Sequence, residues 1–219
     1  ESLYLFEPAA GPDGVQRLAE GLGAGALPAV ITLQLVRSMH VGDAGASELA
    51  AALDRGALPR LQRLWLYNAA IGDAGLVALA SALRRLPALE GLYLQYNAAI
   101  GDEGLAALVL APPLPAGALP PPAGGLAKLK TLYLCHTQIT DAGCATLAAA
   151  LDGGALPALT NLYLDGIPAS DAAQDAVYEA RADLYGGEES ESDEHEESGS
   201  GSDQDEEGEG DSEDGEGDD

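Results

Sequence analysis

The sequence predicts an α/β solenoid in which short parallel strands alternate with helices along residues 1–186. Three observations support this fold class. A Leu-x-Leu pair occurs six times, an apolar residue stands three positions before five of the pairs, and an alanine- and leucine-rich segment follows. Such regular self-similarity indicates stacked repeats that share one continuous core. The pairs are Leu3/Leu5, Leu33/Leu35, Leu64/Leu66, Leu92/Leu94, Leu132/Leu134 and Leu162/Leu164, spaced by 30, 31, 28, 40 and 30 residues.

Each leucine pair predicts a strand. Leu64 and Leu66 alternate with Trp65, so the two leucines point to one face of the strand and the indole points to the other. Stacking of the units joins these strands into one parallel sheet. We expect the sheet to line the concave face of a horseshoe, with the helices on the convex face.

A helix is expected after each strand and a short turn. In residues 73–83, three leucines fall on one helical stripe that packs against the sheet. Asp73 stands at the start of this helix, where we expect its carboxylate to cap the helix's own first turn. Similar Gly-Asp pairs recur at helix starts, which favours caps over calcium ligands; they begin at Gly42, Gly72 and Gly101.

The longest interval between repeats contains a proline-rich insertion at residues 111–125. We interpret it as an expanded surface loop, with a polyproline ligand as the alternative. In the last repeat the helical stripe becomes partly polar, with Gln174, Val177 and Arg181, as a terminal cap requires. Because the chain begins within a strand, at Glu1, we expect it to be a piece of a longer protein.

Residues 187–219 predict a disordered acidic tail. From Glu188 to Asp219 there are 18 acidic residues and no Lys or Arg. Dense like charge with few apolar residues cannot offset the entropy cost of ordering a chain. Three serines have an acidic residue three positions later and are candidate phosphorylation sites: Ser190, Ser200 and Ser202. The tail is either a modulator of binding or a solubilising segment.

These repeats resemble the leucine-rich repeat family, and their length with a full helix per unit is similar to its ribonuclease-inhibitor-like subclass. The resemblance covers nearly all of residues 1–185, and it implies a horseshoe-shaped solenoid. One departure is visible. The asparagine that follows the strand appears as Asn68 and Asn97, offset by one residue between them, and Thr137 takes its place in the fifth repeat.

A candidate binding surface follows from the outward positions of the strands. Eight of the ten aromatic residues fall on or beside this one face. Aromatic side chains dominate hot spots in protein interfaces, so we predict a protein or peptide partner. The alternative is that the rings stack on each other and only stabilise the sheet. The predicted binding residues are Tyr4, Phe6, Trp65, Tyr67, Tyr93, Tyr96, Tyr133, Tyr163, Arg37 and Arg63, with Glu7 and Asp165 adding polar selectivity.

Composition excludes several classes of function. With 36 acidic against 10 basic residues and a net charge of -26, a nucleic-acid partner is not expected. No apolar run is long enough to span a membrane, and two cysteines cannot build a disulfide framework. We therefore expect an intracellular monomer, cytoplasmic or nuclear. His40, His136, Cys135 and Cys144 form no catalytic or metal-binding pattern, so no enzymatic activity, metal or cofactor is predicted.

Two alternative functions rest on likeness of arrangement. Ribonuclease-inhibitor-like repeats followed by an acidic segment are similar in arrangement to Ran GTPase-activating proteins, which implies a regulator of a Ran-like small GTPase. Those proteins carry more repeats, and their catalytic-support residues do not map onto this sequence. A short solenoid with an acidic tail also resembles the acidic leucine-rich nuclear phosphoproteins, which implies binding of histones or a chaperone role.

Overall fold

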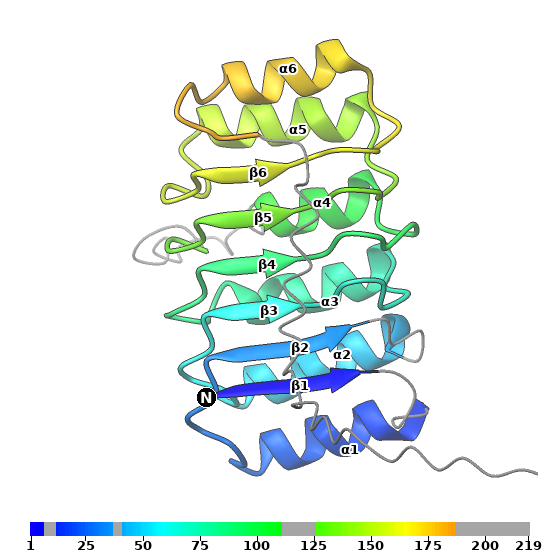
Figure 1. The fold of residues 1–219 in the computed structure, drawn as a ribbon, viewed down its shortest axis with the longest axis vertical. Coiled ribbons are helices and arrows are strands. Elements are labelled where there is room, and N and C mark those ends of the chain that lie inside the picture. Colours follow the sequence, from blue (N-terminus) through cyan, green and yellow to red (C-terminus); the bar gives the residue numbers. More distant parts are fainter. Residues whose placement is uncertain (7–11, 37–40, 111–125, 187–219) are drawn as a thin grey trace, which may run out of the picture. The chain divides into compact units, whose positions relative to one another are not determined.

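The computed structural model describes residues 1–6, 12–36, 41–110 and 126–186, which lie within one compact unit, Glu1–Glu189. Its strands form one parallel sheet in the order β1-β2-β3-β4-β5-β6, and a helix follows each strand (Figure 1). The strands are β1 (Ser2–Phe6), β2 (Thr32–Val36), β3 (Arg63–Trp65), β4 (Gly91–Tyr93), β5 (Thr131–Tyr133) and β6 (Asn161–Tyr163). The helices are α1 (Pro12–Gly23), α2 (Gly42–Asp54), α3 (Asp73–Leu83), α4 (Asp102–Val109), α5 (Asp141–Asp152) and α6 (Asp171–Glu179).

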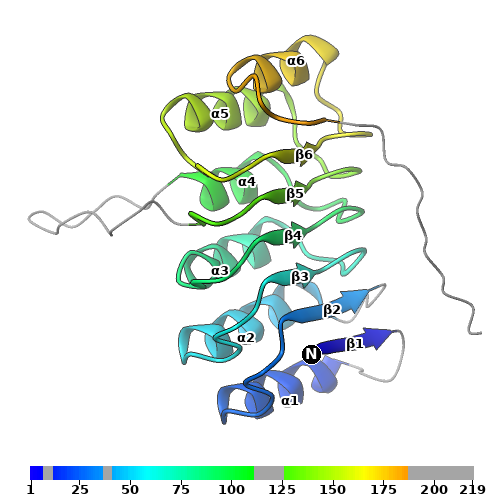
Figure 2. The same ribbon diagram turned by 60° about the vertical axis from the view of Figure 1, so that its left-hand side comes forward.

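The strand register agrees with the sequence pattern. Leu64 pairs with Leu33 of β2 and with Leu92 of β4, and the series continues through Leu132 to Leu162. Figure 2 shows α1 to α6 on one side of the sheet. The predicted α/β solenoid, with strands on one face and helices on the other, is therefore confirmed.

The core lies between the sheet and the helices. In the third repeat, both strand leucines and all three leucines of the predicted α3 stripe are fully buried. Equivalent residues of neighbouring repeats join them in a single hydrophobic cluster. One repeat cannot form this core alone, because its strand and its helix bury their apolar residues only when adjacent repeats pack against them.

The helix caps differ from the prediction. Asp73 was expected to cap its own helix, α3, but the N-cap residue of α3 is Gly72, and Asp73 does not cap this helix. The Asp73 carboxylate instead accepts hydrogen bonds from the backbone N–H groups of Gly101 (2.7 Å) and Gly104 (2.9 Å), at the start of α4. The third repeat thus caps the helix of the fourth. The same relation links Asp43 to Gly72 and Gly75, Asp102 to Thr140, and Asp141 to Ser170.

The offset between the two asparagines has a physical basis. Asn97 is fully buried, and its Oδ1 accepts from the N–H groups of Ala69 (3.0 Å) and Ile71 (3.1 Å) in the preceding repeat. Its amide also donates to the carbonyls of Leu66 and Leu94, both at 2.7 Å. Asn68 lies one position earlier, in the left-handed region at φ 48°. The two asparagines therefore have different structural roles.

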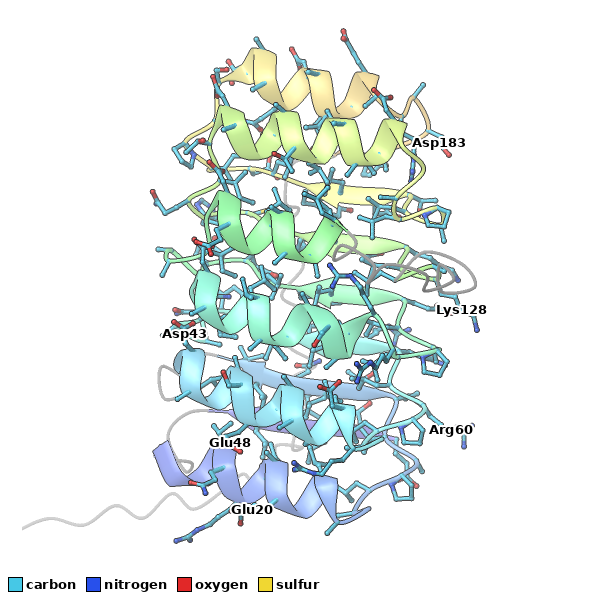
Figure 3. All side chains as sticks on the ribbon, turned by 180° about the vertical axis from the view of Figure 1, so that it is seen from behind. Glu20, Asp43, Glu48, Arg60, Lys128 and Asp183 are labelled. Atoms are coloured by element: carbon cyan, nitrogen blue, oxygen red, sulfur yellow. The ribbon has the colours of Figure 1, made fainter. Side chains whose placement is uncertain are left out.

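The helix ends are chemically polarised. Figure 3 shows Asp43 at the edge where the helices begin, and Arg60 and Lys128 at the opposite edge. At that opposite edge Arg84 donates to the carbonyls of Ala107 and Leu108 at the end of α4, and Arg181 donates to backbone carbonyls after α5. Acidic groups at helix starts and basic groups at helix ends both complement the helix dipoles.

The last repeat forms a terminal cap, as the polar stripe predicted. Val177 is the one fully buried residue of α6, while Gln174 and Arg181 donate to backbone carbonyls. Tyr185 then forms a parallel bridge with Asn161 at the open edge of β6. None of the described helices is long and apolar enough to cross a membrane. The predicted insertion at residues 111–125 and the acidic segment 187–219, with its three serines, lie outside the described residues.

Candidate functional site

The face of the sheet opposite the described helices, which we call the uncovered face, carries a row of stacked rings (Figure 2). The aromatic row consists of Trp65, Tyr93, Tyr133 and Tyr163, one residue from each of β3 to β6 in direct register. Ring centroids are 3.7 Å apart between the first pair, 5.0 Å between the second and 4.0 Å between the third. Interplanar angles of 5°, 22° and 12° make all three contacts stacked. The rings cover each other's faces and present their edges, which remain partly exposed.

Burial changes the acid–base behaviour of the row. Burial raises the pKa of Tyr93, and the nearby Arg63 partly opposes this rise. Burial and a side-chain hydrogen bond with Tyr163 raise the pKa of Tyr133. Both phenols therefore stay protonated near neutral pH, and the row offers neutral O–H groups.

A glycine allows Tyr93 to lie back along its own strand. A side chain at Gly91 would place its Cβ 2.9 Å from the Tyr93 ring and 3.2 Å from its hydroxyl. The ring therefore occupies the space over Gly91, two residues earlier on the same face. This role of Gly91 was not predicted from the sequence. The signal was present, because the equivalent residues in the other strands are Ser2, Thr32, Arg63, Thr131 and Asn161, all of which carry a side chain.

A second aromatic group lies just beyond the strand ends. The Tyr67 and Tyr96 rings meet edge to face at 5.0 Å, and Tyr96 stacks on His136 at 4.4 Å. Tyr96 and His136 both have positive φ, at 61° and 52°, which is uncommon for residues other than glycine. The equivalent residue in the last repeat is Gly166, over which the His136 ring lies. This contact of His136 was not predicted from the sequence.

The structure corrects two outward positions. Alternation along the strands would place Gln95 and Cys135 at outward positions, yet they are 7% and 0% exposed. Cys135 Sγ donates to Asp165 Oδ2 at 3.5 Å. Within the described part of the chain, the Oε1 atom of Gln95 and the Nε1 atom of Trp65 are buried and have no hydrogen-bond partner.

The other predicted binding residues are distributed unevenly. Tyr4 lies in β1 and is 51% exposed, but Gln34 separates it from Trp65 in the register. Arg63 is exposed at the start of β3 and makes no ion pair with any described residue. Phe6 belongs to β1 by its backbone, and its side chain is outside the described part, as are Arg37 and Glu7.

No metal-binding group was found where the structure is described: no three His, Cys, Asp or Glu residues come together. Both cysteines are buried, and neither forms a disulfide within the described part of the chain. Burial raises the pKa of Cys144 to about 11, and Asp141 and Asp102 add to the rise. A thiol of this kind is a poor nucleophile at neutral pH, because the reactive species is the thiolate.

Comparisons with known proteins agree with the repeat architecture. The family model described as Leucine Rich repeat matches residues 87–109 and 125–148, which contain β4, α4, β5 and the start of α5. Curated proteins gave no match. An internalin (InlF) from Listeria monocytogenes is similar at 15% identity with a TM-score of 0.41; the comparison covers 84% of this chain and 46% of that one. This chain thus spans less than half of the internalin structure. Two segments of the chain thus match the leucine-rich repeat model, and the six-strand register fits a leucine-rich repeat solenoid.

Proposed function

We propose that this leucine-rich repeat protein is a protein–protein interaction module whose partner binds the uncovered face of the sheet. The observation that carries the proposal is the aromatic row, which is stacked and yet partly exposed. Large rigid side chains bury much area at small cost in conformational entropy, and stacking fixes them before a partner arrives. We also propose the ribonuclease-inhibitor-like subclass, which the helix in every repeat supports.

Stacking does not reduce this surface to a purely structural feature. Mutual stacking covers the ring faces, but each side chain of the aromatic row keeps part of its surface exposed, and Arg63 is exposed. Tyr67 and Tyr96 extend the same surface toward the strand ends. Among the described elements, no helix lies on this side of the sheet (Figure 2). A contiguous surface of this composition is typical of contact sites.

Affinity capture from a lysate of the source cells, with identification by mass spectrometry, tests the proposal. The variant Trp65→Ala with Tyr133→Ala should lose the captured partner. The matched control is Val77→Ala, since Val77 is 42% exposed on α3, on the helix side of the protein. Retained circular dichroism and unfolding midpoints would show that both variants fold. Equal capture by both variants would contradict the proposal.

The acidic segment at residues 187–219 is proposed to modulate this binding. Its 18 acidic residues attract basic partners and repel acidic ones, and this effect is screened by salt. A chain that ends at Gly187 should therefore bind the same partner with a weaker dependence of affinity on salt. Loss of the partner on this truncation alone would instead make the acidic segment the binding element and favour the histone-type alternative.

A further inference from the structure

The aromatic row ends at a polar residue. Every ring of the row has a ring neighbour on both sides except Trp65, whose single described ring contact is Tyr93. On the other side of Trp65 the register position belongs to Gln34 of β2. One strand further, Tyr4 resumes the aromatic pattern. We call this interruption of the aromatic pattern, at Gln34 between Tyr4 and Trp65, the Gln34 gap.

The dimensions of the Gln34 gap suit one planar group. Neighbouring strands of a sheet are about 4.8 Å apart, so residues on β1 and β3 are about 9.6 Å apart. The register position next to Trp65 holds the Gln34 side chain, which is half-buried and makes no hydrogen bond with a described residue. A flat ring that stacks on the outer face of Trp65 would turn this side chain aside and continue the aromatic row by one position.

The residues around the gap offer polar contacts as well. The Gln34 amide is half-buried and makes no hydrogen bond with any described residue, so it is available as donor and acceptor. Arg63 lies two residues before Trp65 on the same face of β3, is exposed, and has no acidic partner in the described part of the chain. A carboxylate is the natural complement of an exposed guanidinium.

Resting on the proposed function, we propose that the Gln34 gap receives one aromatic side chain of the partner, from an extended segment with an acidic residue two positions away. In an extended chain, residues i and i+2 point to the same side, which matches the spacing of Trp65 and Arg63. The aromatic ring stacks on Trp65, and the carboxylate pairs with Arg63. The like charge of Arg63 disfavours a basic residue at the second position.

The test is a selection of displayed random 12-residue peptides on the full chain, with four forms compared. The wild type should enrich peptides that carry Asp or Glu two positions from Phe, Tyr or Trp. Gln34→Tyr places a ring of the protein itself next to Trp65 and should therefore abolish that enrichment. Gln34→Ala keeps the gap open and should preserve it. Arg63→Glu should replace the acidic residue of the selected peptides with Lys or Arg.

A direct readout of contact is available, because Trp65 is the single tryptophan of the chain. A synthetic peptide from the wild-type selection should change Trp65 fluorescence in the wild type and in Gln34→Ala, but at least tenfold less strongly in Gln34→Tyr. Unfolding curves of Gln34→Tyr verify its fold. The proposal is overturned if Gln34→Tyr binds the peptides as the wild type does, or if no aromatic peptide is enriched.

Partner capture separates this proposal from the broader one. If Gln34→Tyr still captures the cellular partner while Trp65→Ala with Tyr133→Ala does not, the sheet face is the binding surface and the Gln34 gap is not its anchor. If neither change affects capture, both proposals are wrong. Loss of capture in both, with Gln34→Ala unaffected, supports both.

Discussion

The carboxylate of Asp73 accepts a hydrogen bond from the backbone N–H of Gly104, at 2.9 Å, and so reaches from the start of α3 to the start of α4. This contact between repeats requires that the residue that donates the N–H group has no side chain. A Cβ on Gly104 would lie 2.6 Å from the same carboxylate oxygen. The Asp and the Gly therefore act as one unit that spans two repeats.

Replacement of Asp73 by Ala should lower the free energy of unfolding by about 1–2 kcal/mol, the usual cost of a lost helix cap. The loss arises because the N–H groups of Gly101 and Gly104 no longer have this acceptor. Urea unfolding followed by circular dichroism measures it. Asp175→Ala removes an exposed carboxylate of α6 that makes no side-chain hydrogen bond, and it serves as the control. An equal effect at both positions would contradict the inter-repeat cap.

Two glycine substitutions should act in opposite directions. Gly143→Ala places a Cβ 2.2 Å from Asp102 Oδ1, so we expect a loss of about 1–3 kcal/mol from overpacking and a displaced cap. Gly21→Ala in α1 meets nothing within 4 Å and should stabilise the protein by about 0.5–1 kcal/mol through helix propensity. Thermal unfolding of the two variants checks the difference in sign.

Asn97 should be far less replaceable than its counterpart Thr137. Asn97→Ala leaves two buried N–H groups and two carbonyls without their side-chain partner, and we expect a cost of about 3 kcal/mol or more. Thr137 donates one hydrogen bond, to the carbonyl of Leu134, so Thr137→Val should cost about 1 kcal/mol. Chemical denaturation of both variants provides the comparison, and similar costs would refute the distinction.

Stability should fall at alkaline pH through Cys144. Burial raises the pKa of this thiol from its ordinary value of 9.0 to about 11, so the unfolded chain releases the proton at lower pH than the folded one. The stabilising contribution is complete below pH 9 and is lost as pH rises toward 11. Unfolding free energies between pH 8 and 11 should decline less steeply for Cys144→Ala than for the wild type. Parallel slopes would count against this assignment.

Trp65 emission should report on its stacked neighbour. Tyr93→Ala removes the ring 3.7 Å from the indole and exposes that face, so the fluorescence maximum should shift to the red. Stability should also fall, by about 0.5–1.5 kcal/mol beyond the lost burial. Tyr163→Ala removes a ring that does not contact Trp65 and should leave the emission unchanged. A shift in both variants would indicate a general loosening of the sheet instead.

The strands and their register could be predicted because the leucine pairs and their spacing determine both. Each pair aligns with the next, so the positions of Trp65 and Tyr93 on one face followed directly from the pattern. Which helix the Asp73 carboxylate caps could not be predicted, since by sequence alone it stands equally well placed for its own helix. The packing of neighbouring repeats brings Gly101 and Gly104 within its reach, and this contact lies about 30 residues away along the chain.

The candidate site was predicted in part. The stacked rings were anticipated, but alternation along a strand does not reveal that neighbouring side chains bury Gln95 and Cys135. The role of Gly91 likewise depends on which way the Tyr93 ring lies, and a sequence does not encode ring direction in its periodicity. The repeat pattern therefore predicted the arrangement of the backbone, but it did not predict the orientation and burial of individual side chains.

Hydrogen bonds between repeats run in both directions along the chain. The carboxylate of Asp73 accepts from the start of α4, while Asn97 and the carbonyl of Ala99 in the next repeat accept from N–H groups just before and at the start of α3. Loss of order in one repeat would therefore leave polar backbone groups without partners on both of its neighbours. Such two-way dependence favours cooperative unfolding of adjacent repeats over the opening of one repeat at a time.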